Sequence, residues 1–231
     1  MNLCFYGKFA RFAKWLLCAF SPKYHCDLAP TDQPVVYVCR HLNMHGPFTT
    51  MKWLPCHVHP FVLHVYFDRK KTVRHMTQYT FSVRQGKKPK NFCLRAHVMS
   101  WIAPPIMHSM QAIAVYRSSA QSLSTLKSGL KYLLKGESLI VYPDIDYTGH
   151  YGSPSDIYDG FLMLGAMYRK KTGKSLSFIP LVIDDRRRTI TAGDPVFADH
   201  FRRDRAAAAA CLKMAINDLD GQILPAPGPT V

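Results

Sequence analysis

Residues 35–47 read VVYVCRHLNMHGP, an apolar run that passes directly into polar residues. The five apolar residues 35–39 are typical of a strand that is buried on both faces. Arg40 and His41 follow at the end of this strand. In an α/β sheet, functional groups gather at the carboxyl ends of the strands. This stretch therefore predicts a central strand with a functional imidazole at its end.

Strand patterns alternate with helical patterns on both sides of this stretch. The further strands are expected over residues 57–67, 111–116, 138–142 and 176–183. The helices are expected over residues 48–53, 118–135, 157–168 and 204–219, with Gly136 closing the second and Gly221 the last. This alternation predicts an α/β fold with a mostly parallel central sheet flanked by helices.

Charged side chains follow several of the expected strands. Arg117 comes directly after the strand that ends at Tyr116, and the run Pro143-Asp144-Ile145-Asp146 comes after the strand that ends at Tyr142. An imidazole accepts a proton near neutral pH, and a guanidinium binds phosphate bidentately. These groups together predict general-base chemistry on an anionic substrate.

In order along the chain, these segments resemble four blocks of the glycerolipid acyltransferase superfamily, whose type member is 1-acylglycerol-3-phosphate acyltransferase. The Asn-His-x-x-x-x-Asp-Pro block is similar to residues 40–47, and the block that ends in a phosphate-contacting Arg is similar to residues 114–117. The Phe-Pro-Glu-Gly-Thr-Arg block partly matches residues 142–147, and the Val-Pro-Val-x-Ile strand is similar to residues 179–183.

The resemblance implies transfer of an acyl group from acyl-CoA or acyl carrier protein to the hydroxyl of a lysophospholipid or a related acceptor. His41 would be the general base, and Asp146 would support it as the second catalytic residue. The implied substrate-binding residues are Arg40, Arg117, Pro143 and Asp144. The resemblance implies no cofactor beyond the acyl donor, and we expect no metal ion.

Four positions depart from the family pattern. The catalytic Asp, five residues after the His, is Gly46, and in the third block Glu is Asp144, Gly is Ile145 and Arg is Tyr147. Loss of the carboxylate that orients a catalytic imidazole costs about 10⁴-fold in a serine protease. Candidates for a replacement orienting group are Asp144, Asp146, Asn43 and His45, of which Asp146 is favoured because it lies just beyond a neighbouring strand end. The alternative is a catalytically inactive relative that binds a lipid or a partner.

The charge of the chain is strongly asymmetric. Against 15 Asp and Glu it carries 30 Lys and Arg, a net charge of +15, and residues 1–100 hold 15 of the basic side chains but only 3 acidic ones. Such an excess predicts an anionic partner. A composition that is 48 % hydrophobic excludes a disordered chain.

The first 30 residues predict an amphipathic helix at a membrane surface. Lys8, Arg11 and Lys14 share one side, and aromatic and aliphatic side chains occupy the opposite one. The longest uninterrupted apolar run, residues 15–20, is too short to span a bilayer. We therefore expect residues 1–30 to lie in the interface of an anionic membrane and residues 31–231 to form the acyltransferase-like domain. The expected location is cytoplasmic, peripheral at the inner face of the membrane.

Two other classes of function are less favoured. His41 and His45 have a spacing that is compatible with zinc, but the Glu of His-Glu-x-x-His is absent. Basic and aromatic residues alternate over residues 66–95, as in single-strand nucleic-acid binders, but no known nucleic-acid-binding module is present. We therefore expect no nucleic-acid partner. The seven cysteines form no Cys-x-x-Cys pair, which indicates reduced thiols.

Overall fold

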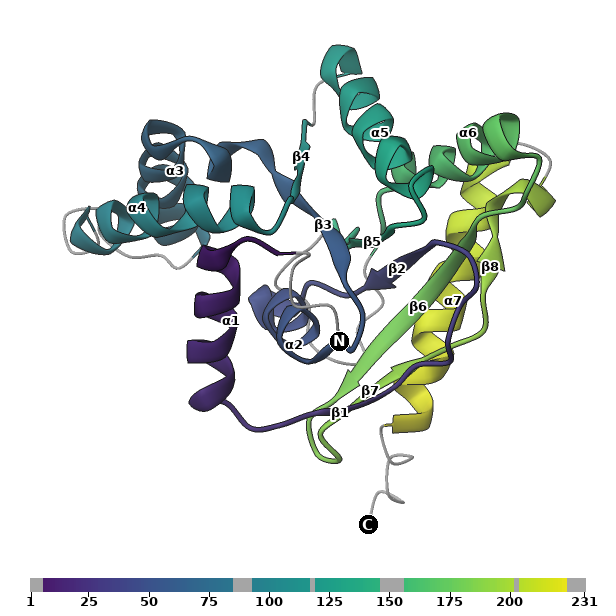
Figure 1. Ribbon diagram of the computed structural model, residues 1–231, viewed down its shortest axis with the longest axis horizontal. Coiled ribbons are helices and arrows are strands. Elements are labelled where there is room, and N and C mark those ends of the chain that lie inside the picture. The colour runs from purple at the N-terminus through teal and green to yellow at the C-terminus, as the bar shows by residue number, and fades with distance from the viewer. Residues whose placement is uncertain (1–5, 85–92, 117–118, 146–155, 202–203, 224–231) are drawn as a thin grey trace. The chain divides into compact units, whose positions relative to one another are not determined.

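The computed structural model describes residues 6–84, 93–116, 119–145, 156–201 and 204–223 (Figure 1). Its strands are β1 (His25–Asp27), β2 (Val35–Cys39), β3 (Val58–Leu63), β4 (Ile113–Val115), β5 (Ser138–Val141), β6 (Ser177–Asp184), β7 (Thr189–Ala192) and β8 (Val196–Phe197). Its α-helices are α1 (Lys8–Ala19), α2 (His45–Trp53), α3 (Arg69–His75), α4 (Cys93–Ser109), α5 (Ser119–Leu133), α6 (Met163–Thr172) and α7 (Arg205–Ile223).

The strands form a mixed sheet in the order β1-β7-β6-β2-β5-β3-β4, and β8 pairs with β6. Strand β2 lies between β6 and β5 and is parallel to both, with Tyr37 opposite Ile179 on one side and Ile140 on the other. Strands β7 and β8 are antiparallel to β6. The α/β class and the mostly parallel sheet expected from the sequence are thus confirmed.

The chain divides into two compact units. The first comprises Leu17–His59 and Leu126–Val231, and the second comprises Asn2–Leu16 and Pro60–Thr125. This division describes how the chain packs. The division expected at residue 30 concerns membrane association and stays a prediction.

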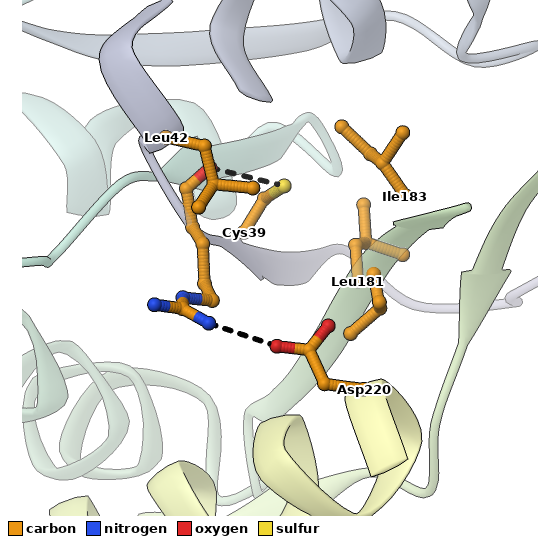
Figure 2. Close-up of a pocket in the computed structure, with 7 residues that line it drawn as sticks. Cys39, Leu42, Leu181, Ile183 and Asp220 are labelled. Carbon is orange, nitrogen blue, oxygen red and sulfur yellow. Dashed lines mark hydrogen bonds and ion pairs between the residues drawn. The ribbon is translucent and has the colours of Figure 1, made fainter. Parts of the chain in front are cut away.

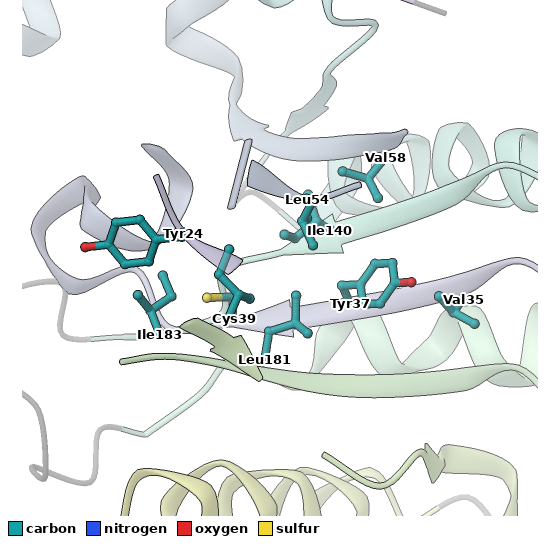
Figure 3. Close-up of a cluster of buried hydrophobic side chains, with 10 residues drawn as sticks. Tyr24, Val35, Tyr37, Cys39, Leu54, Val58, Ile140, Leu181 and Ile183 are labelled. Atoms are coloured by element: carbon teal, nitrogen blue, oxygen red, sulfur yellow. The ribbon is translucent and has the colours of Figure 1, made fainter. Parts of the chain in front are cut away.

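In the first unit, both faces of β2 are buried, as its continuous apolar sequence predicts. One face carries a core cluster to which Tyr37 and Cys39 contribute, with Met51 and Trp53 of α2 packed against it (Figure 3). Helix α7 packs across β6 on the opposite face (Figure 1). Strand β2 is therefore held between two layers of helix, which fixes the direction in which its carboxyl end emerges.

The second unit is mostly helical. Strand β3 enters it from the first unit and pairs in parallel with β4. Helix α3 begins after Asp68, whose carboxylate accepts the backbone N–H of Lys71 at 2.8 Å as an N-terminal cap. The backbone N–H of Gly7, just before α1, donates to the carbonyl oxygen of Ser109 at the end of α4 at 2.8 Å. The N-terminal helix is thereby attached to α4.

Two expected helices have different limits in the structure. The helix expected over 157–168 begins only with a 3₁₀ turn at Gly160, because the backbone at Ile157 pairs with Asp144 instead. Helix α7 does not end at Gly221 but continues to Ile223. Helices α3 and α4 were not expected at all, and the two prolines inside α4 explain part of that failure.

Candidate active site

Three neighbouring parallel strands, β6, β2 and β5, end at the same edge of the sheet and place polar residues there. Arg40 and His41 follow β2, and Asp144 follows β5. The backbone N–H of His41 donates a hydrogen bond to the carboxylate of Asp144, which is buried. The expectation that these strand ends meet is therefore confirmed for His41 and Asp144. The group of His41 that makes this hydrogen bond is its backbone N–H.

Arg40 is buried, with 6 % of its surface exposed, and its contacts are with carboxylates of the fold. Its Nη1 lies 2.9 Å from Oδ2 of Asp220 on α7 (Figure 2), and its Nε lies 4.0 Å from Oδ1 of Asp144. Burial raises the pKa of the Asp220 carboxyl, and Arg40 counteracts part of that effect. These contacts support a structural role for Arg40, which ties the end of β2 to α7, and its role in substrate binding stays a prediction.

Position 46 is closed to any side chain. A Cβ atom built on Gly46 would lie 1.8 Å from the carbonyl oxygen of Arg40. The backbone N–H of Gly46 donates to the carbonyl oxygen of His41 at 3.2 Å, which closes the loop between them. The intervening residues Leu42, Asn43 and Met44 all have positive φ angles, of 41°, 53° and 77°. Such non-glycine residues cost about 1–3 kcal/mol each and cluster at functional sites.

Nδ1 of the His41 imidazole accepts a hydrogen bond from the backbone N–H of Met44, over 3.3 Å. In the neutral ring, the other nitrogen, Nε2, then carries the proton. A carboxylate at Nδ1 would fix the opposite tautomer, in which Nε2 is the base. The ring also lies edge-on to Tyr142, with centroids 6.2 Å apart. The loop from His41 to Gly46 therefore favours His41 as a donor at Nε2.

A second imidazole at this edge does have a carboxylate partner. Nε2 of His45, the first residue of α2, lies 2.8 Å from Oδ1 of Asp185, which follows β6. The hydroxyl of Tyr24 donates to the same oxygen at 2.6 Å. Burial and this hydrogen bond raise the pKa of Tyr24 to about 12. Sequence reasoning missed the role of Asp185, although its place just beyond an expected strand end was a usable signal.

A hydroxyl chain fixes the start of α2 against the end of β5. Oγ1 of Thr50 donates to the carbonyl oxygen of Gly46 at 2.7 Å. The hydroxyl of Tyr142 lies 2.7 Å from the same Oγ1, and it is the donor because the Thr50 proton is already used. Since Thr50 is fully buried, this network holds the loop around Gly46 in place.

Two predicted site residues, Arg117 and Asp146, lie outside the residues that the structure describes. The residue before Arg117, Tyr116, belongs to the second unit and stacks on His64 with ring centroids 4.8 Å apart. Pro143 is buried, and its carbonyl oxygen accepts the backbone N–H of Tyr158 at 2.9 Å. The proposed roles of these residues in binding and catalysis stay predictions.

Two small pockets border this edge. One, of about 180 Å³, is lined by Cys39, Arg40, Leu42, Leu181, Val182, Ile183 and Asp220 (Figure 2). The other, of about 200 Å³, lies between Arg40, Asp144 and α7. Arg40 lines both pockets, so its buried side chain separates them.

Among the described residues, no group of three His, Cys, Asp or Glu side chains is placed to hold a metal ion. His59 is fully buried; its Nε2 lies 3.1 Å from Oε2 of Glu137, and its ring stacks on Tyr132. No helix of the described chain is both long and apolar enough to cross a membrane.

The chain has an α/β fold with a mostly parallel sheet, and comparison with a solved structure shows that this fold is acyltransferase-like. The crystal structure of the 1-acyl-sn-glycerophosphate (LPA) acyltransferase PlsC from Thermotoga maritima is similar to it, with a TM-score of 0.54 and 10 % sequence identity. The match covers 95 % of this chain and 80 % of that one. No model of a protein family matches the sequence, and no curated protein does. The likeness therefore concerns the fold.

Proposed function

We propose that the protein is a divergent acyltransferase that moves an acyl group from acyl-CoA or acyl carrier protein to the hydroxyl of a lysophospholipid or related acceptor at a membrane surface. The observation that carries the proposal is the meeting of His41 and Asp144 at neighbouring strand ends of a fold similar to that of PlsC. His41, Arg117 and Asp144 also occur in the sequence in the order in which the resemblance places a base, a phosphate-binding Arg and an acidic residue.

In the proposed reaction, His41 removes the proton of the acceptor hydroxyl. The oxygen of that hydroxyl attacks the carbonyl carbon of the thioester. The tetrahedral intermediate then collapses, the carbon–sulfur bond breaks, and the leaving thiolate takes the proton from the imidazolium. Asp144 holds the backbone at His41, and Asp146 is proposed to support the ring. Arg117 is proposed to bind the phosphate of the acceptor, because a guanidinium binds phosphate bidentately.

A second function, binding without catalysis, is favoured by one specific observation. The loop at Gly46 leaves no room for a carboxylate, and Nδ1 of His41 accepts the N–H of Met44. For Nε2 to act as the base, the ring must exchange this hydrogen bond for one in which Nδ1 donates. If it does not, the same edge of the sheet is a binding site for a lipid or a partner.

An acyl-transfer assay separates the two functions. Labelled acyl-CoA and acyl carrier protein are offered with a panel of lysophospholipids, and wild type is compared with His41→Ala. Loss of a general base predicts a fall in turnover of about 10²–10⁴-fold. His25→Ala is the matched control, because His25 is exposed on the edge strand β1.

If the wild type turns over substrate and the His41→Ala variant does so at the same rate, the proposed mechanism is refuted. A wild type that binds a lysophospholipid but turns over none of the donor–acceptor pairs would establish the binding function instead.

For the location, we propose that the protein binds the inner face of an anionic membrane peripherally through its N-terminal segment. Two observations support this proposal. Helix α1 buries Ala10 and exposes Phe9, Phe12 and Trp15, and Phe20, which follows the helix, is exposed as well. Aromatic side chains of this kind favour the headgroup region of a bilayer.

A further inference from the structure

Helix α4 of the second unit has the reverse of the usual distribution of side chains. Its buried face carries small residues, at Ala96, Ser100 and Ala103. The large apolar side chains of Leu94, Val98, Trp101 and Ile102 are exposed, and Leu94 and Trp101 have exposed fractions of 78 % and 61 %. Their spacing of four, seven and eight residues places them on one face of the helix. We call these four residues the α4 face.

Cationic side chains border the α4 face. The guanidinium carbon of Arg69, at the start of α3, lies 2.9 Å from the ring centroid of Trp101. Lys70, Lys71 and Arg74 of α3 and Arg95 of α4 are exposed. Residues 60–125 contain ten Lys and Arg, and Asp68 is their single acidic residue. The carboxylate of Asp68 caps α3, and within the described part of the unit Arg69, Lys70, Lys71, Arg74 and Arg95 lie on α3 and α4.

We propose that the α4 face inserts into the interface of an anionic lipid bilayer, with the cations of α3 at the phosphates of the headgroups. A large apolar and aromatic face bordered by Lys and Arg is the composition of segments that lie in such an interface. Continuous apolar exposure of this kind marks an interaction surface, and the charge selects anionic lipid as the occupant.

This contact is additional to the one proposed for α1. The hydrogen bonds from Gly7 and Ala10 to Ser109 attach the N-terminal part of α1 to the end of α4 within the second unit. The second unit therefore has two membrane-binding helices, and α4 does not depend on the acyl-transfer chemistry proposed above.

The test is co-sedimentation of the full-length protein with vesicles of equal parts phosphatidylcholine and phosphatidylglycerol. Leu94→Glu/Trp101→Glu removes two apolar anchors and adds two negative charges, and we expect its partition into these vesicles to fall by about tenfold or more. The matched control is Leu134→Glu/Met214→Glu, which makes the same changes at exposed apolar positions of the first unit. The control is expected to bind like the wild type.

A fluorescence measurement gives an answer that does not depend on how the Glu variant folds. Trp15→Phe/Trp53→Phe leaves Trp101 as the single tryptophan. We expect vesicles that contain brominated lipid to quench it and to shift its emission to the blue. Absence of quenching, or a partition of the folded Glu variant equal to that of the wild type, would overturn the proposal. So would a Glu variant that changes only the oligomeric state in gel filtration, since the face would then bind a second copy.

Discussion

Gly46 is the residue at which the sequence suggested a departure from the acyltransferase pattern. Introducing a carboxylate there by Gly46→Asp is expected to destabilise the protein. The new Cβ would meet the carbonyl oxygen of Arg40 at 1.8 Å, and the carbonyl oxygen of Gly46 is itself held by the buried Thr50. We expect the free energy of unfolding to fall by about 1–3 kcal/mol or more, measured by urea denaturation.

Gly160→Ala serves as the control for this substitution. A Cβ at Gly160 meets no atom within 4 Å, so the free energy of unfolding should stay within about 0.5 kcal/mol of the wild type. A Gly46→Asp variant as stable as this control would contradict the closed loop. If the Gly46→Asp variant also gained acyltransferase activity, the result would show that the loop can open at little cost in free energy.

Asp220 makes the free energy of unfolding depend on pH, and the sign of this dependence follows from the burial of its carboxyl. Its pKa is raised in the folded protein, mainly by burial and despite its ion pair with Arg40. Above the ordinary Asp value of about 4, the folded state therefore binds this proton more tightly than the unfolded chain does. The unfolding free energy due to this group is fully present below that pH and falls as the pH rises through the folded pKa.

The measurement compares urea unfolding of the wild type and of Asp220→Asn from pH 3.5 upward. The other titrating groups contribute to both proteins, so the difference isolates Asp220. We expect the stability of the wild type to fall relative to the variant as the pH rises above about 4. A relative rise over that interval would show that the ion pair with Arg40 outweighs the effect of burial.

At the scale of elements, α7 is the helix that closes the sheet beneath the candidate site. Its residues Ala208, Leu212 and Ile216 follow one another at intervals of four and are all buried. We expect Leu212→Ala to lower the free energy of unfolding by about 2–5 kcal/mol, through lost apolar burial and the cavity left behind. Met214→Ala, on the same helix but 64 % exposed, should change it by less than about 0.5 kcal/mol in urea denaturation. Equal losses for the two variants would contradict the observed packing of α7.

Some helices and strands could be predicted from the sequence and others could not. Strands β2, β5 and β6 were predictable because their apolar runs are short, continuous and limited by polar residues. Helix α4 was not, because Pro104 and Pro105 lie inside it and prolines usually end a helical pattern.

The candidate site was predictable only where strand ends determine it. The meeting of His41 with Asp144 follows from parallel neighbouring strands. The pairs Arg40–Asp220 and His45–Asp185 join residues 180 and 140 positions apart, and no local pattern indicates them. The loss of the family's Asp was visible in the sequence, but the closure of the loop by the Arg40 carbonyl depends on three positive φ angles that no residue type there requires.

At the scale of the whole molecule, the asymmetric distribution of charge predicts which part of the protein binds a membrane. Residues 1–100 carry 15 of the 30 basic side chains with 3 acidic ones, whereas the rest of the chain is nearly balanced. If net charge alone drives binding, reversing any two exposed cations should weaken it equally. If position matters, cations beside the exposed aromatic residues of α1 should matter more, because electrostatic attraction falls off within about 10 Å at 0.1 M salt.

Lys8→Glu/Arg11→Glu on α1 and Lys170→Glu/Lys174→Glu around the end of α6 lower the net charge by the same amount, and all four side chains are exposed. We expect the α1 variant to lose about tenfold or more of its partition into phosphatidylglycerol vesicles, since each surface cation contributes about 1 kcal/mol. The α6 variant should bind within about twofold of the wild type at the same salt concentration, because its substitutions lie outside the two helices proposed to bind the membrane. Equal losses in the two variants would mean that the positive charge attracts the membrane without orienting the protein on it.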